Sequence, residues 1–261
     1  MKTTILTLAL LFLVGLAEPL YSAEAAIHLG VSLHPSHIQI GADFNGAQIA
    51  VTGRVPSGAS ALVRLTGPPE DRHLKQKGRA LGVLWMNLGS VEISNVPSVF
   101  LLYLPKADAP SPAKRPPAWQ SLGLGLKGLA AKAAIVAADT DQATIFNEFV
   151  KLKEKSGLYG VMPNVVHYGP DDGIQKTFQA TLALPAALPQ GDYHIAVLAI
   201  QDGAVSTSAI QTIDARETGM PAWISAMAFN HGTLYGVLAV VVAVIAGLTT
   251  GILFKDKGGA H

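Results

Sequence analysis

The chain has 261 residues, of which 49% are hydrophobic and 14% are charged, and its 19 Lys and Arg against 18 Asp and Glu give a net charge of +1. A nearly neutral chain has no global attraction for nucleic acid. The sequence contains no cysteine, which excludes disulfides, a lipidated cysteine anchor and covalent haem attachment. The stability of a folded domain must therefore come from packing and hydrogen bonding alone.

The N-terminus has the pattern of a secretory signal peptide, which we expect to be residues 1–25. A basic residue precedes the apolar stretch 5–16, and Ala23-Glu24-Ala25 matches an A-x-A cleavage site. The alternative is an uncleaved membrane helix, which the Glu-Pro pair at 18–19 would interrupt. Cleavage would leave a mature chain that begins near Ala26.

Residues 26–218 are expected to form one exported domain of short strands broken by turn residues. The apolar positions from 38 to 44 lead to Asn45-Gly46, which favours a tight hairpin, before an alternating strand at 49–51. Further strands are expected at 61–66, 91–93, 100–104, 178–184, 192–200 and 204–213. This spacing predicts a mainly β fold, an immunoglobulin-like β-sandwich with a helical insertion.

The expected helical insertion comprises residues 119–169 and follows a proline-rich linker at 105–117. Within it, Asp139-Thr140-Asp141-Gln142 predicts a helix N-terminus, and the apolar positions that follow recur at helical spacing. Lys151, Lys153 and Lys155 favour the C-terminus of this helix. We expect its aromatic stripe to pack in the core.

The segment 188–193, Leu-Pro-Gln-Gly-Asp-Tyr, resembles the entry to a late strand of immunoglobulin-like or fibronectin-like sandwiches. In those domains a tyrosine hydroxyl bonds the backbone of the corner. Tyr193 is the tyrosine that we predict for this role.

Residues 234–254 form an uncharged apolar stretch, and residues 255–261 are expected to be a short cytoplasmic tail. As a helix the stretch would reach roughly 31 Å, about the thickness of the hydrocarbon core of a bilayer. Lys255 and Lys257 belong on the cytoplasmic side by the positive-inside rule. Residues 219–233 are expected to lie at the interface, and a stem packed on the sandwich is the alternative. We therefore predict a single-pass protein of a bacterial inner membrane with a periplasmic N-terminal domain.

Small residues recur every four positions along the predicted span, at Ala239, Ala243, Gly247 and Gly251. Such a stripe allows close contact between membrane helices. It is either a helix-packing face or the small-residue content that membrane helices commonly have.

Several short segments spread along the chain carry a family resemblance. In chain order they are Asp43-Phe44-Asn45-Gly46, Ile49-Ala50-Val51-Thr52-Gly53, Gly67-Pro68-Pro69, Lys77-Gly78-Arg79, Trp85-Met86-Asn87, Asn95-Val96-Pro97-Ser98, Leu158-Tyr159, Leu184-Pro185, Pro189 to Tyr193 and Leu234-Tyr235-Gly236. In this order they resemble the "putative transmembrane protein" family described mainly from alphaproteobacteria. The resemblance implies a signal peptide, an exported domain and one C-terminal span. It also implies an association with permeases that resemble sulfite exporters, and it implies no activity and no catalytic residues.

A basic stretch is the predicted face for a partner or an anion. Its residues are Arg72, Lys75, Lys77 and Arg79, followed by Trp85 and Asn87. In an extended strand Lys75, Lys77 and Arg79 project from one face and can meet phosphate headgroups, an anionic solute or an acidic partner. The alternative is an edge strand that its charges protect against aggregation.

Three histidines, His28, His34 and His37, lie near the expected mature N-terminus. Imidazoles suit copper, nickel or zinc, so these residues suggest the hypothesis of a metal site, and surface histidines without a metal are the alternative. The glycines of the stretch 123–128 match the G-x-G-x-x-G loop of dinucleotide sites. Because a proline-rich linker precedes this loop where a buried strand is required, we expect a packing segment and no bound cofactor.

The sequence has no G-x-S-x-G elbow, no H-E-x-x-H motif and no cysteine nucleophile. We therefore predict a non-enzymatic, membrane-anchored periplasmic accessory or interaction protein, associated with a membrane complex or a permease, or with itself. The alternative is an exported module that binds an anion or a metal. The expected partners are the lipid bilayer and a membrane protein, and no nucleic acid.

Overall fold

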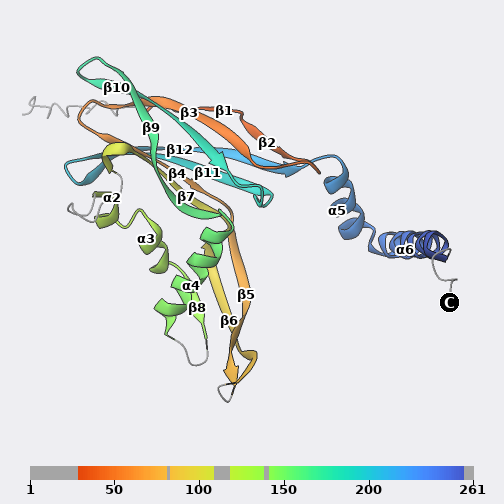
Figure 1. Ribbon diagram of the computed structural model, residues 1–261. Helices are drawn as coiled ribbons and strands as arrows, with labels where there is room; N and C mark the ends of the chain where they lie inside the picture. Colours follow the sequence, from red (N-terminus) through yellow and green to blue (C-terminus); the bar gives the residue numbers. More distant parts are fainter. Residues whose placement is uncertain (1–28, 81–82, 109–117, 138–140, 256–261) are drawn as a thin grey trace, which may run out of the picture.

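The structure is a computed structural model that describes residues 29–80, 83–108, 118–137 and 141–255 (Figure 1). The strands are β1 (Ser32–His34), β2 (His37–Ile40), β3 (Ala47–Pro56), β4 (Ser60–Thr66), β5 (Pro69–Ala80), β6 (Leu84–Pro97), β7 (Phe100–Pro105), β8 (Ala134–Val136), β9 (Tyr159–Asp171), β10 (Gln175–Leu184), β11 (Gly191–Gln201) and β12 (Ala204–Glu217). The helices are η1 (Lys106–Asp108), α2 (Ala118–Ser121), α3 (Leu126–Ala130), α4 (Gln142–Lys155), α5 (Met220–Asn230) and α6 (Gly232–Lys255). The predicted mainly β fold with a C-terminal apolar helix is confirmed. The predicted signal peptide lies outside the described residues.

Nine strands form one large sheet in the order β1-β3-β10-β9-β7-β4-β11-β12-β2. Neighbouring strands are antiparallel except for the pairs β7 with β9 and β12 with β2. The two edge strands, β1 and β2, are consecutive in the chain and are separated only by Pro35 and Ser36. Because so short a connection joins opposite edges, the sheet must curl until those edges meet.

The core lies inside this curled sheet. Strand β10 alternates between buried and exposed residues, as expected for a strand with one face in water. All six residues of β7 are buried, and so are the consecutive residues Ala61, Leu62 and Val63 of β4. The strands in the middle of the sheet are therefore covered on both faces, which explains their uninterrupted apolar sequences.

The tight hairpin that we predicted at Asn45-Gly46 is wrong. Strand β2, which precedes this dipeptide, pairs in parallel with β12, more than 170 residues further along the chain, whereas β3 pairs with β1 and β10. Gly46 has a φ of 96°, and a Cβ at this position would lie 2.5 Å from the backbone oxygen of Leu184. The glycine thus serves a close approach between two backbones, which local sequence alone does not distinguish from a hairpin turn.

The predicted tyrosine corner is present. Tyr193 is fully buried, and its hydroxyl donates a hydrogen bond of 2.6 Å to the backbone oxygen of Pro189. Burial raises the pKa of Tyr193 to about 12, so the hydroxyl keeps its proton at neutral pH. The contact fixes the start of β11 against the loop that precedes it.

Tyr193→Phe is expected to lower the free energy of unfolding by about 1 kcal/mol, because it leaves the half-buried carbonyl of Pro189 without its donor. Urea unfolding of the full chain in mild detergent, followed by far-UV circular dichroism, measures this change. Tyr235→Phe removes the same hydroxyl from an exposed position and serves as the control. Equal stability of Tyr193→Phe and the native chain would contradict the structural role of the corner.

The helical insertion is shorter than predicted. It contains α2, α3, the short strand β8 and α4, and it ends before Tyr159, where β9 enters the large sheet. The predicted range 119–169 therefore included most of a strand. Asp141 caps the N-terminus of α4, because its carboxylate accepts from the backbone N–H of Thr144 at 3.0 Å, while Asp139 lies outside the described residues. The buried side chains of α4 are Ile145, Phe146, Phe149 and Lys153.

Gly123 and Gly125 of the stretch 123–128 lie in the turn between α2 and α3, and Gly128 lies within α3. A Cβ on Gly125 would lie 2.7 Å from the ring of Trp119, and a Cβ on Gly128 would lie 1.7 Å from the backbone oxygen of Gly123. Trp119 is buried and donates from its indole nitrogen to the backbone oxygen of Asp108 at 3.0 Å. The glycines therefore make room for a tight turn against a tryptophan, in agreement with a packing segment.

Candidate functional site

The most distinctive feature of the domain is an arm that we define as β5, β6, β8 and α4. The long hairpin of β5 and β6 extends away from the large sheet, and α4 lies along it (Figure 1). Strand β6 pairs with β5 on one side and with β8 on the other, so that β5 and β8 are the edges of this three-stranded sheet. The arm also contains every residue of the predicted basic face.

The basic residues predicted from sequence lie together on this hairpin. Lys75 pairs with Ser90, Lys77 with Asn87, and Arg79 with Trp85 across the antiparallel strands β5 and β6. The side chains of Lys75, Lys77, Arg79 and Asn87 are exposed. The structure thus places residues from two separate parts of the predicted basic face next to each other across the hairpin. The structure also places β5 at a sheet edge. The alternative interpretation, an edge strand that its charges protect against aggregation, requires this position.

A groove runs between β5 and α4. It has a volume of about 600 Å³ and an apolar floor made by Leu74, Val91, Ile145 and Phe149. Leu152 of α4 lines it with 52% of its surface exposed. Sequence reasoning did not find this groove, because its two walls are separated by a long stretch of chain.

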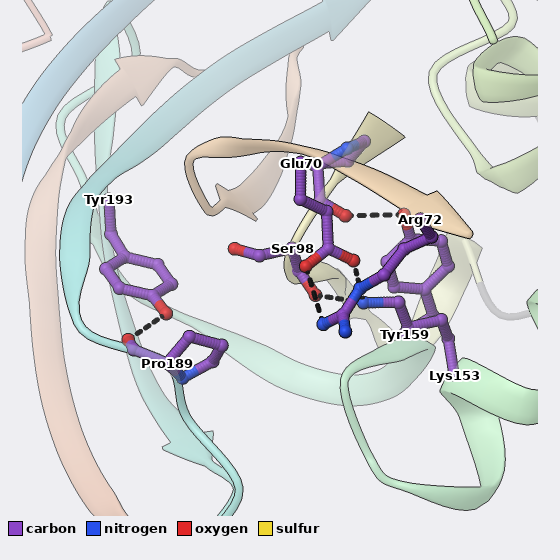
Figure 2. A network of polar contacts seen from close by, with 8 residues as sticks. Glu70, Arg72, Ser98, Lys153, Tyr159, Pro189 and Tyr193 are labelled. Atoms are coloured by element: carbon purple, nitrogen blue, oxygen red, sulfur yellow. Dashed lines mark hydrogen bonds and ion pairs between the residues drawn. The ribbon is translucent and has the colours of Figure 1, made fainter. Parts of the chain in front are cut away.

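Where the arm joins the large sheet, a buried ionic cluster connects α4 to β5 (Figure 2). Lys153 is 5% exposed, and its ammonium contacts a carboxylate oxygen of Glu70 and donates to the backbone oxygen of Ser98 at 3.0 Å. The second carboxylate oxygen of Glu70 accepts from Arg72 at 2.8 Å. The hydroxyl of Tyr159 donates to the backbone oxygen of Pro97 at 2.6 Å. The cluster thus ties both ends of the hairpin to α4 and β9.

The aromatic rings beside Lys153 complete this environment. The ammonium lies 5.6 Å from the ring centroids of both Phe149 and Tyr159, within the range of a cation–π interaction. Those two rings meet edge to face, with their centroids 5.8 Å apart. Lys153 therefore has a charge partner, a carbonyl acceptor and two aromatic neighbours, which together offset part of its loss of hydration.

Burial lowers the pKa of Lys153, and the hydrogen bond and charge of Glu70 offset only part of this effect. For Glu70, burial raises the pKa, but the hydrogen bonds and charges of Arg72 and Lys153 together outweigh burial and hold the pKa below its ordinary value of 4.5. Burial also raises the pKa of the Tyr159 hydroxyl. Glu70 is therefore ionised at neutral pH, opposite the ammonium of Lys153.

Because the pKa of Glu70 is lower in the folded chain than in the unfolded chain, the stability that it contributes is present above its unfolded pKa. This contribution is lost as the pH falls below 4.5 and through the folded pKa. We expect Glu70→Gln to show a weaker decrease of unfolding free energy with acidification than the native chain. Urea unfolding across this pH range measures the two slopes, and identical slopes would contradict the coupling.

The sequence contained one signal for this cluster that the prediction missed. From the sequence, Lys153 was assigned only a favourable charge near the C-terminus of the helix. It lies four residues after Phe149 and eight after Ile145, and therefore on the same buried face of α4. A lysine in register with an apolar stripe indicates a buried cation that requires an acidic partner, although it does not identify Glu70.

Within the described residues, the structure does not bring the predicted metal ligands together into one site. His34 lies in β1 and His37 in β2, both exposed, while His28 lies outside the described residues. Within the described ranges, no three His, Cys, Asp or Glu side chains are grouped closely enough to hold a metal ion.

Helix α6 is the one helix among the described residues that is long and apolar enough to cross a membrane, with a mean hydropathy of 2.6 over Gly232–Phe254. Its membrane-spanning window has no residue buried within the protein. Ala239, Ala243, Gly247 and Gly251 lie on this exposed helix, and a Cβ on either glycine would have no neighbour within 4 Å. The predicted packing stripe is therefore accessible from outside the chain.

The helix before it, α5, has no charged residue and also exposes apolar side chains. Trp223 is half exposed, and Phe229 is 88% exposed. The hydroxyl of Ser225 donates to Glu217, the last residue of β12. The predicted juxtamembrane segment is thus a separate helix between the domain and α6.

Comparison with known proteins agrees with the membrane helix. A family model described as "putative transmembrane protein" matches residues 28–256, a range that includes all of the described residues. No curated protein matches the chain significantly. The predicted family is confirmed, and the apolar helix α6 associates the protein with a lipid bilayer. The chain belongs to this family of transmembrane proteins.

Proposed function

We propose that the protein is a non-enzymatic, membrane-anchored accessory subunit that uses its arm to hold another membrane protein. The observation that carries this proposal is the arm, which combines exposed lysines on β5 with an apolar groove beside α4. Charged strands and apolar grooves beside them recognise polypeptides in many interaction proteins. A single anchoring helix would keep such a surface close to partners in the same membrane.

In this proposal the domain is an immunoglobulin-like sandwich in the periplasm, anchored in a bacterial inner membrane with its C-terminus in the cytoplasm. The Tyr193 corner and the meeting of β1 with β2 support the sandwich. Lys255 and Lys257, directly after the span, support the orientation. Because the chain contains no cysteine, Ser90→Cys and Gly259→Cys each give a single labelling site. A membrane-impermeant maleimide should label only the first in intact spheroplasts, and the reverse pattern would invert the topology.

The partner that we propose is an integral membrane protein, and a permease resembling sulfite exporters is the candidate that the family resemblance supplies. Gentle detergent solubilisation of the tagged full chain, followed by mass spectrometry, tests the accessory role. We expect one membrane protein to co-purify in constant proportion. Repeated recovery of the chain alone as a monomer would contradict the proposal.

The second candidate function is binding of a small anion, which the exposed pair Lys75 and Lys77 favours. Thermal unfolding of the full chain in detergent with phosphate or sulfate, compared with chloride at equal ionic strength, distinguishes the two functions. Specific stabilisation that Lys75→Glu with Lys77→Glu abolishes would support anion binding.

A further inference from the structure

Strand β5 has an open edge. In the sheet β5-β6-β8 it pairs with β6 alone, and within the described residues no strand pairs with its other side. From Arg72 to Gln76 its pairing with β6 is regular, with one residue of β6 opposite each residue of β5. An unpaired edge presents a row of backbone N–H and C=O groups to an added strand. Within this stretch, Arg72 to Lys75 is therefore the part of β5 suited to such pairing.

The two faces of β5 differ in chemistry. Leu74 is half-buried and packs against the core, while its neighbour Lys75 is exposed, as is Lys77. Because side chains alternate between the faces of a strand, Leu74 and the two lysines lie on opposite faces. A strand added to this edge would meet an apolar face on one side and a cationic face on the other.

The groove extends the apolar face beyond β5. Leu74 and Val91, which are paired across the hairpin, line it together with Ile145, Phe149 and the half-exposed Leu152 of α4. Lys75, Gln76 and Lys77 of β5 also line the groove, so that the cationic side chains lie close to its apolar floor. An added strand would place every second side chain over this groove. The side chains between them would project towards Lys75 and Lys77.

We infer that the arm binds an extended polypeptide segment with alternating acidic and apolar residues, which adds as a strand to the open edge of β5. This inference rests on the proposed function and identifies the chemistry of the partner segment. The acidic side chains pair with Lys75 and Lys77, the apolar ones enter the groove, and backbone hydrogen bonds to β5 fix the register. Glu148 also lines the groove, but it is paired with Lys151 at 2.7 Å, so its charge is already matched.

Charge argues against a second copy of this chain as the occupant. Antiparallel pairing of β5 with its own copy about Gln76 would set Lys75 of each strand beside Lys77 of the other, and like charges across a strand pair destabilise it. Among the neighbouring residues of β5, His73 lies 3.9 Å from Glu92, and both are exposed. The positive charge of Lys75 and Lys77 therefore favours binding of a segment of opposite charge over self-association of β5.

The test uses the full chain in nanodiscs of phosphatidylcholine, which carry no net charge. The probe is a labelled peptide of about eight residues in which Glu and Val alternate, and the control peptide has the same composition with Glu and Val in separate blocks. We expect the alternating peptide to bind about tenfold more tightly in fluorescence anisotropy. Amide hydrogen exchange of β5 between Arg72 and Lys75 should slow when this peptide binds, because strand addition protects outward N–H groups.

Charge reversal supplies the matched variants. Lys75→Glu with Lys77→Glu should weaken binding of the alternating peptide about tenfold or more. Lys127→Glu with Lys132→Glu, which reverses two exposed lysines outside β5, should leave the affinity unchanged. Equal binding of both peptides, unchanged affinity after reversal in β5, or unchanged exchange of β5 would each overturn the inference. Slower exchange of β5 in phosphatidylglycerol nanodiscs but not with peptide would also overturn it and assign this face to lipid.

The failure of this inference can be separated from the failure of the proposed function. If a membrane protein co-purifies equally with the native chain and with Lys75→Glu, Lys77→Glu, the accessory role stands and strand addition to β5 is wrong. If the native chain brings no membrane protein with it, the accessory role itself is contradicted.

Discussion

Glu70→Gln is expected to lower the free energy of unfolding by about 3 kcal/mol, because removing one partner of a buried ion pair leaves the other charge without compensation. Lys153 would keep its acceptor at Ser98 and its aromatic neighbours but would lose the only carboxylate that it contacts among the described residues. The loss should loosen the junction of α4 with the base of the hairpin. Urea unfolding of the full chain in mild detergent measures the change.

Two variants separate the buried pair from the exposed one. Arg72 binds the same carboxylate, but its side chain is 48% exposed, so Arg72→Gln should change the stability by less than about 1 kcal/mol. Glu70→Gln combined with Lys153→Met should recover most of the loss, since no unpaired charge remains buried. A change of less than about 0.5 kcal/mol in Glu70→Gln alone would contradict the structural role of the cluster.

Val241→Arg combined with Val244→Arg is expected to prevent stable insertion of α6. Each arginine near the middle of a spanning helix raises the free energy of insertion by about 3 kcal/mol, and both side chains lie on an exposed apolar helix. The pair should therefore shift insertion by about 6 kcal/mol. Alkaline carbonate extraction of membranes should release the double variant while the native chain stays in the pellet.

The matched control replaces the same residues with leucine, which preserves the apolar surface of α6. This variant should remain in the membrane pellet like the native chain. If the double arginine variant also remains fully membrane-integrated, α6 is not the anchor, and the association of the domain with the bilayer must come from another segment.

Local sequence was sufficient for several elements of the fold. The turn before β12, the strand β10 and the corner at Tyr193 each depend on residues close together in the chain, and the structure contains all three. Strand β9 was missed because Pro163 and Asn164, whose φ is 63°, interrupt its alternation. The pairing of β2 with β12 was missed because it joins distant parts of the chain.

The candidate site also combines features that local sequence predicted with features that only tertiary packing creates. The basic face of β5 was visible in the sequence, since Lys75, Lys77 and Arg79 follow the period of a strand. The groove and the buried pair were not visible, because Glu70 and Lys153 are 83 positions apart and meet only when α4 packs against the hairpin. Periodicity identifies the face on which a residue lies, whereas its partner across the fold depends on tertiary packing.

Site-specific photo-crosslinking in intact cells tests the central claim, that the arm contacts a membrane partner. A photoreactive residue at Ser90 or Lys77 reports on the arm, and one at Thr212, an exposed position of β12, reports on the large sheet. We predict that the arm positions crosslink to one integral membrane protein and that the β12 position does not. Absence of crosslinks from both arm positions, or the same crosslinks from β12, would contradict the account.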